Sequence, residues 1–458
     1  MIEIQVFYCY NSNSEKVREM KNKLIDINLI ILTLLTSALW IYKVEDFILI
    51  LGIYLILFLY LWIRKKPITH YVVVILFSFM SNSNHAEILL VDYILTVILF
   101  IAVLYKCFRE KQIVIGKLLP ILLIYTLYSL LSILWTPIKS HGFEGLAFML
   151  EGYMLYIILT NSGVKITKDY FIIISKIATY LMLSLTLETF SIYHFNGFED
   201  TIINKGMLRY GWGFSNTVAV VYTFLIPVSF YKYLNRKKYY PQFFVLDIIN
   251  LFGLVLTLSR GAMVGVGVSL VILVLFTINK LFFFRYYSII IGLIITSLSV
   301  SKVKNYILMI IDRLFINKEF LDDSGRFELY KFAYEGFLKK PIFGHGLKAS
   351  KFLIDEYFGS GPVHVHNFIL QIMFALGIVG LLMLGIILYK IFILFFQKEL
   401  FIICLGLGLI ASLTHQMMDI SFDILHFGLL MYGLIGVVEL YRHYNTDDLY
   451  KMKVYKKQ

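Results

Sequence analysis

The sequence predicts an all-α fold, a polytopic bundle of about 12 to 14 transmembrane helices with one long extracytoplasmic loop that carries short amphipathic helices. Two observations predict this class. First, 59% of the 458 residues are hydrophobic and 16% are charged, whereas soluble domains average roughly 45–50% and about 25%. Second, apolar runs near the roughly 20 residues that cross a bilayer recur from Leu24 to Leu440. An ordinary soluble enzyme is therefore excluded.

The apolar runs set the order of the transmembrane helices. They are separated by short polar or charged connections of the kind that lie at a membrane surface. We expect spans near residues 24–42, 46–63, 68–80, 87–105, 118–136, 145–160, 170–190, 215–234, 243–259, 262–278, 286–300, 367–388, 400–414 and 424–440.

The distribution of cations predicts the orientation of the chain. Lysine and arginine gather in alternate connections, for example at 64–66, 106–111 and 236–238, while the connections between these hold few cations. The positive-inside rule therefore places both termini in the cytoplasm. We therefore attribute the net charge of +12 mainly to cations in cytoplasmic connections, and we expect no nucleic-acid partner. Residues 1–23 are polar and charged and lack the apolar core of a signal peptide.

One outward connection is far longer than the others, and loops of such length are usually functional. In it, residues 305–315 place apolar side chains on one helical face, as an interfacial helix does. A second helix should begin after Asp322–Ser324, whose short side chains suit an N-cap, and end at Pro341. The chain thus divides into a cytoplasmic N-terminal tail (1–23), N-terminal transmembrane helices (24–300), an extracytoplasmic catalytic loop (301–366), C-terminal transmembrane helices (367–440) and a cytoplasmic basic tail (441–458).

Three ionisable residues near the outer ends of spans are candidates for chemistry, because charge close to lipid is costly and normally has a partner or a substrate. Arg260 lies at the outer tip of an apolar hairpin, among small neighbours. Arg326 falls in the first turn of the loop helix, where free backbone N–H groups favour an anion and a guanidinium could bind phosphate in bidentate fashion. His366 lies where the long loop re-enters the membrane and, with an ordinary pKa of about 6.5, could accept a proton.

Each candidate has a simpler interpretation. Arg260 could be an interfacial anchor whose side chain reaches the headgroups. Arg326 could form a surface salt bridge with Asp322–Asp323. His364 and His366 could ligate a metal, but no Glu-x-x-His or cysteine partner accompanies them, so no metal is expected.

The second outward loop holds a further candidate. Arg209 and Trp212 lie in the string Leu208–Gly213, where a cation and aromatic rings could line a sugar site. The same residues could equally anchor the loop at the interface, where tyrosine and tryptophan are enriched.

Five short strings follow one another along the second half of the chain. They are Leu256–Gly261 (LTLSRG), Ser324–Leu329 (SGRFEL), Pro341–Gly346 (PIFGHG), His366–Leu370 (HNFIL) and Leu376–Gly380 (LGIVG). In this order they resemble the successive signatures of the O-antigen ligase and O-antigen polymerase family. An earlier string, Gly211–Asn216, is similar to the Gly- and Asn-rich start of that family's preceding span, so the resemblance covers about residues 209–380.

The resemblance implies a membrane glycosyltransferase of the GT-C type that uses no metal or other cofactor. Its donor would be an oligosaccharide on undecaprenyl diphosphate, at the outer face of the bacterial cytoplasmic membrane. Arg260 and Arg326 would stabilise the leaving diphosphate, and His366 would take the proton of the acceptor hydroxyl. Asn367 or a backbone group would fix the tautomer of that histidine. The residues expected to bind substrate are Arg209, Trp212, His364 and Asn367.

Three functions stay open at this point. We favour a polymerase that joins repeat units into O-antigen or capsule, because no dedicated acceptor domain is evident. A ligase would instead transfer the finished glycan to lipid A core, protein or a wall acceptor. A flippase or transporter would show matched halves with broken helices, which the 7 prolines and unlike halves do not suggest. Expected partners are the lipid-linked oligosaccharide, the bilayer, and the flippase and chain-length regulator of the same pathway.

Overall fold

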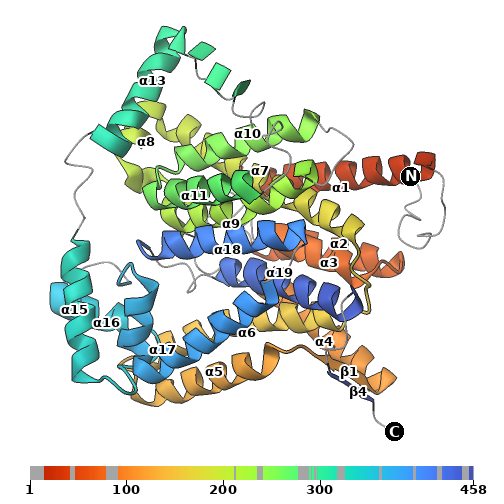
Figure 1. Cartoon of the computed structure of the whole chain (residues 1–458), viewed down its shortest axis with the longest axis vertical. Helices are drawn as coiled ribbons and strands as arrows, with labels where there is room; N and C mark the ends of the chain where they lie inside the picture. The colour runs from red at the N-terminus through yellow and green to blue at the C-terminus, as the bar shows by residue number, and fades with distance from the viewer. Residues whose placement is uncertain are drawn as a thin grey trace.

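The chain folds as a bundle of helices, as the sequence predicts (Figure 1). Within the described residues, β-structure is limited to two short two-stranded pairs. The structure, a computed structural model, describes residues 15–41, 47–78, 91–210, 213–234, 241–276, 288–289, 291–292, 295–296, 298–316, 325–359, 364–395, 399–419, 425–445 and 453–456.

The helices follow the apolar runs. The first group comprises α1 (Glu15–Ile41), α2 (Phe47–Ile63), α3 (Ile68–Ser78), α4 (Val91–Glu110), α5 (Leu119–Ser132), η3 (Ile133–Trp135), α6 (Lys139–Thr160), α7 (Lys168–Asn196), α8 (Phe198–Ile203), η4 (Lys205–Met207), α9 (Ser215–Leu234), α10 (Pro241–Leu256) and α11 (Arg260–Phe276). The second group comprises α13 (Ser301–Ile311), η5 (Asp312–Ile316), α15 (Arg326–Lys339), α16 (Ala349–Phe358), α17 (Phe368–Phe395), α18 (Leu400–Gln416) and α19 (Leu425–Asn445).

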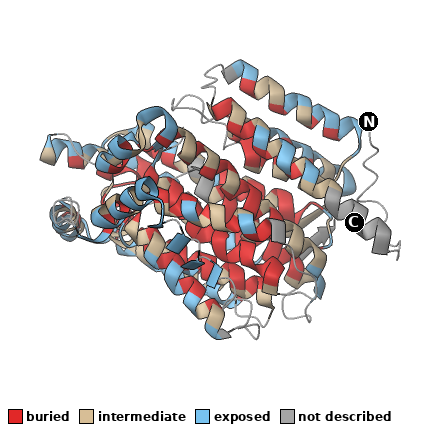
Figure 2. Cartoon of the chain, turned by 90° about the horizontal axis from the view of Figure 1, so that it is seen from above, coloured by how far each residue is buried: buried red, intermediate tan, exposed pale blue. Residues whose placement is uncertain are grey.

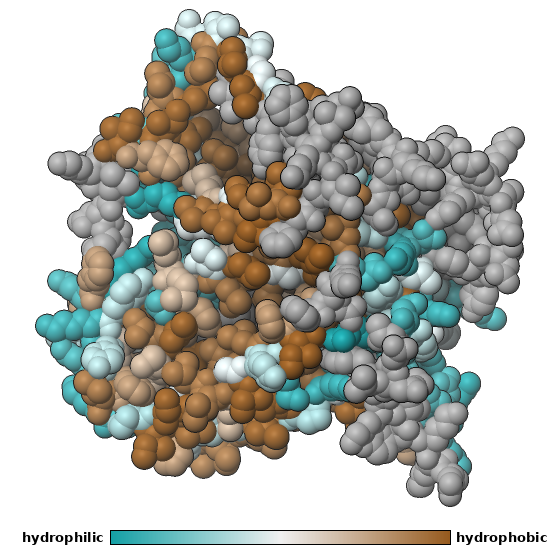
Figure 3. Space-filling view, viewed as in Figure 1, coloured by the Kyte–Doolittle hydropathy of each residue, from teal (hydrophilic) through white to brown (hydrophobic). Residues whose placement is uncertain are grey.

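The prediction of a polytopic membrane protein is confirmed. In the part of the chain that the structure describes, six helices are long and apolar enough to cross a membrane, and six shorter apolar helices accompany them. Every expected span except 286–300 coincides with a helix, and that span lies mostly outside the described residues. An apolar surface runs across the middle of the molecule, with hydrophilic residues gathered beside α15 and α16 at one edge (Figure 3).

Helix α9 lies at the centre of the bundle. It packs against α7, α11 and α18, and nearly all of its side chains are buried. Buried residues fill the middle of the bundle (Figure 2). A helix that is apolar all round belongs in such a position. Small residues allow close approach, because Gly408 of α18 faces the carbonyl of Phe224. Hydroxyl pairs such as Thr223 and Ser412, 3.1 Å apart, satisfy the buried polar groups.

The long loop contains the two expected helices, with two differences in detail. The interfacial helix does not continue regularly to 315, because α13 ends at Ile311 and the π-helix η5 follows. The loop helix α15 begins at Arg326 and ends shortly before Pro341. The N-cap expected at Asp322–Ser324 is wrong, because Gly325 occupies that position with φ of 74°. Residues 322–324 themselves lie outside the described part of the chain.

Helix α17 is broken at Gly377, where φ is 65° and ψ is −163°. The loop 341–346 fills the break and takes over its backbone hydrogen bonds. The four bonds run from His345 N to Phe374 O (2.9 Å), from Gly346 N to Ala375 O (2.8 Å), from Ile378 N to Pro341 O (2.9 Å) and from Val379 N to Ile342 O (3.4 Å). The strings PIFGHG and LGIVG therefore form one backbone clamp, which fastens α15 and α16 to a membrane helix.

The C-terminal tail marks the other end of the molecule. Strand β4 (Lys453–Lys456) pairs antiparallel with β1 (Gln112–Ile115), which follows α4. This pair lies far from α15 and α16 (Figure 1). Both strands adjoin segments that the cations predict to be cytoplasmic, and their pairing places these two segments on the same side of the bundle.

Candidate active site

A cavity of about 830 Å³ lies at the end of the bundle that carries the long loop. Its wall is formed by the segment between α8 and α9, the turn between α10 and α11, η5, the start of α15 and the end of α18. Two apolar rings, Phe214 and Phe327, are also part of this wall, and both are exposed. The cavity thus joins segments that are more than 200 residues apart in the chain.

Four cations converge on this cavity from four elements. Lys205 comes from η4, Arg260 from α11, Arg313 from η5 and Arg326 from α15. Asp419 is the one carboxylate among the described wall residues. The structure therefore brings together the two arginines singled out from the sequence and adds two cations beside them. Such an excess of positive charge in one concave site is suited to a multiply charged anion.

Three helices also begin at the cavity. The first residues of α9, α11 and α15 are Ser215, Arg260 and Arg326, and all three line the wall. The N-terminus of a helix carries partial positive charge and unpaired N–H groups. Helix ends of this kind are common phosphate sites. The backbone and the side chains therefore favour the same kind of ligand, an anion.

Lys205 is held inside the cavity by two hydrogen bonds. Its Nζ donates to Oδ1 of Asn216 at 2.6 Å and to the carbonyl of Leu258 at 3.0 Å. Burial lowers the pKa of Lys205 from 10.5 to about 7, and the charges of Arg313, Arg326 and Arg260 act in the same direction. An incoming anion would reverse this effect, because it would stabilise the charged ammonium.

Arg313 reaches the cavity from the π-helix η5. Its Nη1 donates a 2.6 Å hydrogen bond to the carbonyl of Ile203. Burial lowers the pKa of the guanidinium from its usual value, opposed by Tyr193. Single π-turns are rare in proteins as a whole, but those that occur are often found at functional sites. The sequence showed this segment only as an amphipathic helix, so the role of Arg313 was missed.

His366 lies beside the wall and contacts two of its residues. Its Nδ1 is 3.1 Å from Oδ1 of Asp419, and the hydroxyl of Tyr330 donates to its carbonyl at 3.2 Å. The backbone of His366 has φ of 58°, an uncommon conformation for a histidine. The carboxylate of Asp419 can accept a hydrogen bond from Nδ1–H, which leaves Nε2 with its lone pair as a base. In place of Asn367 or a backbone group, the structure has Asp419 at Nδ1 of His366.

Asn367 has a positioning role. Its Oδ1 accepts hydrogen bonds from the N–H groups of Ile369 and Leu370, both at 3.1 Å, so it caps α17. Its Nδ2 donates to the carbonyl of Met417 at 3.2 Å, which ties the start of α17 to the end of α18. These bonds set the relative position of His366 and Asp419.

The other candidates are not among the residues that line the cavity, and one of them lies outside the described residues. Arg209 is exposed, and its guanidinium lies 5.8 Å from the ring centre of Phe214 in the wall. His364 is half-buried, two residues before His366. Trp212 lies outside the described part of the chain. Among described residues, no three His, Cys, Asp or Glu side chains are grouped as metal ligands would be.

Two comparisons with known proteins bear on this site. Residues 245–385 match the sequence profile of a family described as O-Antigen ligase, and this region contains Arg260, Arg313, Arg326 and His366. The chain is also 26% identical over 293 residues to a protein of Rickettsia conorii that is provisionally named a polysaccharide ligase, covering 56% of this chain and 68% of that protein. The resemblance indicated by the sequence motifs is thus confirmed. Both findings fit the ligase interpretation better than the polymerase that we favoured from the sequence.

Proposed function

We propose that this protein, whose central region resembles the O-antigen ligase family, transfers a glycan from a polyprenyl diphosphate to an acceptor hydroxyl. The observation that carries the proposal is the convergence of four cations and three helix N-termini on one cavity beside the His366–Asp419 pair. We place the reaction at the outer face of the cytoplasmic membrane, with both termini in the cytoplasm. The donor class and the orientation are parts of the proposal.

The cations would stabilise the leaving group. When the bond between the anomeric carbon and the diphosphate oxygen breaks, negative charge develops on the diphosphate. Arg260 and Arg326 present planar guanidinium groups that match phosphate oxygens in pairs. Lys205 and Arg313 add charge in a partly buried site, where electrostatic stabilisation is stronger than in water. In this mechanism the four side chains supply the positive charge, and no metal is required.

His366 would act as the general base. Nε2 accepts the proton of the acceptor hydroxyl while the hydroxyl oxygen forms the new bond to the anomeric carbon. Asp419 stabilises the imidazolium that results, as the acid of a catalytic triad does. The proton then leaves to solvent, and polyprenyl diphosphate is the second product.

We favour a ligase that transfers an assembled glycan over a polymerase, because both comparisons point to ligase-type proteins. The two enzymes would use the same donor and differ only in the acceptor. A surface polysaccharide transferred to lipid A core, to protein or to a wall polymer fits this proposal.

Deletion of the gene followed by analysis of surface glycan tests the proposal. Loss of a ligase leaves long glycans on polyprenyl diphosphate, whereas loss of a polymerase leaves single repeats on the acceptor. Complementation with His366→Gln should not restore the glycan. His194→Gln is the matched control, because His194 is an exposed histidine in the last turn of α7. Full complementation by His366→Gln would remove that histidine from the mechanism.

A further inference from the structure

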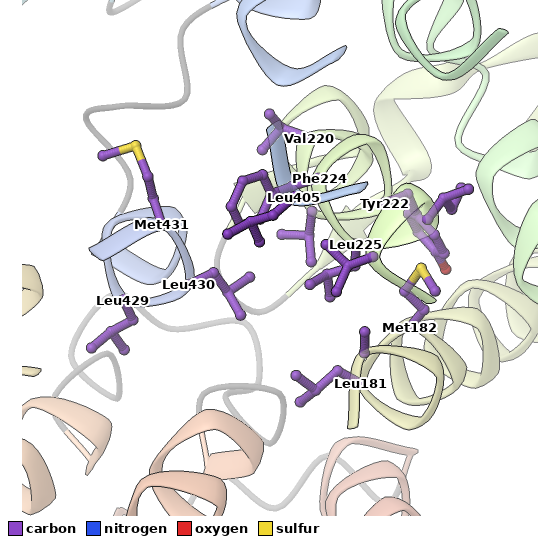
Figure 4. Close-up of a cluster of buried hydrophobic side chains, with 14 of the residues drawn as sticks. Leu181, Met182, Val220, Tyr222, Phe224, Leu225, Leu405, Leu429, Leu430 and Met431 are labelled. Atoms are coloured by element: carbon purple, nitrogen blue, oxygen red, sulfur yellow. The ribbon is translucent and has the colours of Figure 1, made fainter. Parts of the chain in front are cut away.

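A second cavity lies near the connection between α2 and α3, away from the cation-lined site. Its volume is about 290 Å³, and its wall is almost entirely apolar. Residues of α1, α2, α3, α6, α7, α9 and α19 contribute to this wall. Leu181, Leu225 and Leu430 line the cavity from three different helices and belong to one cluster of buried side chains (Figure 4).

The exposed wall residues of α1 and α2 indicate an opening of the cavity between these two helices. Helix α1 packs against α7 and α3, whereas α2 packs against α3 and α4, so the two helices diverge. Ile31 of α1 and Tyr60 of α2 both line the cavity, and they are 56% and 42% exposed. In a membrane this opening would face lipid, and a hydrocarbon chain could pass through it.

Polar groups line the cavity mainly at the end nearest the α2–α3 turn. Lys66, Thr69 and His70 lie there. Lys66 is the last of three consecutive cations that begin at Arg64. The turn is tight, since the N–H of Lys66 bonds to the carbonyl of Leu61 at 2.9 Å. Burial and the neighbouring charge of Arg64 lower the pKa of Lys66. An anion at this turn would relieve the crowding of positive charge.

We propose that this cavity binds an anionic glycerophospholipid, with one acyl chain between α1, α3, α7 and α19 and the phosphate at the Arg64–Lys66 turn. The apolar wall matches the acyl chain, and the cations at one end match the headgroup. Basic pockets beside transmembrane helices bind anionic headgroups in this way. By the orientation proposed above, the lipid comes from the cytoplasmic leaflet.

This site does not depend on the proposed glycosyl transfer. The α2–α3 turn lies at the end of the bundle opposite to α15 (Figure 1), so a lipid with its phosphate there cannot present a diphosphate to Arg260 or Arg326. We expect the bound lipid to stabilise the folded protein. A ligand that binds only the folded state raises the melting temperature, and this lipid would fill the space between α1 and α7.

The test uses the full chain reconstituted in nanodiscs of phosphatidylcholine with or without phosphatidylglycerol. We expect phosphatidylglycerol to raise the melting temperature and to remain bound in native mass spectra. The double variant Arg64→Gln/Lys66→Gln should bind it roughly 30-fold more weakly, since each cation near a headgroup contributes about a factor of five. Ala178→Phe should abolish retention, because Ala178 is buried in the wall and a phenyl ring would fill the cavity.

The matched control is Arg109→Gln/Lys111→Gln, which removes two exposed cations from another connection on the same side. This variant should behave like the wild-type protein. The proposal would be overturned if the melting temperature were the same in nanodiscs with and without phosphatidylglycerol. It would also be overturned if the Arg64/Lys66 variant retained phosphatidylglycerol as the wild-type protein does. Should Ala178→Phe fail to fold, the Arg64/Lys66 variant decides alone, because its substitutions lie at the surface.

Discussion

The ammonium of Lys205 donates a hydrogen bond to the carbonyl of Leu258, 3.0 Å away, and so joins the α8–α9 and α10–α11 connections, which form one side of the cation-lined cavity. Leu258 has φ of 54°, a left-handed conformation that is uncommon outside glycine. This turn directs its carbonyl toward Lys205 and places Arg260 two residues later at the start of α11. The position of one cation is therefore coupled to the backbone that carries another.

Lys205 should make donor binding depend on pH. Its pKa is about 7 in the empty cavity, so its charge is lost as the pH rises through 7, and affinity for a diphosphate should fall. Bound anion restores the charge, so the protein should take up close to one proton on binding at pH 8. Calorimetry in buffers of different ionisation enthalpy measures this uptake. The Lys205→Arg variant should bind the diphosphate without proton uptake. Equal proton uptake by the variant and the wild-type protein would contradict the role of Lys205.

Lys205 should also make the stability of the protein depend on pH. Stability should increase as the pH rises, whereas affinity for the diphosphate should decrease. Between pH 7 and 10.5 the unfolded chain keeps the Lys205 proton while the folded protein has lost it. The unfolded state then binds more protons, so this residue makes the free energy of unfolding increase with pH over that range. Lys205→Met should remove this part of the increase. Thermal unfolding of the two proteins without donor, compared from pH 7 to 10, measures the difference.

Asp419→Asn should reduce turnover far more than donor binding. The amide keeps the size of the side chain but can donate to Nδ1 of His366, which favours the tautomer with the proton on Nε2. The base is then blocked, and we expect turnover to fall by about 10²-fold or more. A donor affinity within about threefold of the wild-type value would accompany this loss if Asp419 acts through His366. Normal turnover would show that the contact is only structural.

Arg260→Lys and Arg326→Lys should both be inactive, although they keep the charge. Lysine lacks the planar pair of N–H donors that matches phosphate oxygens. We expect a loss of about 100-fold in transfer rate with normal amounts of folded protein. Arg442→Lys serves as a control, because this arginine contacts carbonyls in α17 far from the cavity. A wild-type rate for Arg260→Lys would favour the interfacial-anchor interpretation of that residue.

The clamp between the long loop and α17 should depend on glycine at 377. A Cβ there would clash with the carbonyl of Ile342, and the backbone lies in a region that is nearly restricted to glycine. Gly377→Ala should destabilise the protein by about 1–3 kcal/mol from backbone strain alone. Gly385→Ala in the same helix is the control, because nothing lies within 4 Å of its added Cβ. Equal melting temperatures for the two variants would show that the clamp is not needed.

The sequence predicts the helices well because a transmembrane span is a local property. Apolar length defines each span, and the alternating cations define the side on which a connection lies. Arg260 could be found because it is a charge at the tip of an apolar hairpin, and Arg326 because it falls in the first turn of a predicted helix. Arg313 and Asp419 could not be distinguished in this way. Arg313 lies in a segment with an amphipathic pattern, and Asp419 lies in a cation-poor connection that resembles an ordinary loop.

The break in α17 could not be predicted for a similar reason. The expected span 367–388 is apolar along nearly its whole length, which indicates an unbroken helix. The break becomes possible only because the loop 341–346 supplies donors and acceptors for the interrupted backbone, and that contact depends on tertiary packing. Lys205 is likewise recognisable as a site residue only after α9, α11 and α15 have been brought together.

The orientation of the chain can be tested with single cysteines. Once Cys9, Cys107 and Cys404 have been replaced by serine, Glu356→Cys on α16 should react with an impermeant maleimide in intact cells, because Glu356 is exposed on the long loop. Arg109→Cys is the matched probe, since it replaces an exposed residue at the end of α4 near β1. It should react only after lysis. The reverse pattern would place the cation-lined cavity in the cytoplasm, where a donor that is presented outside could not reach it.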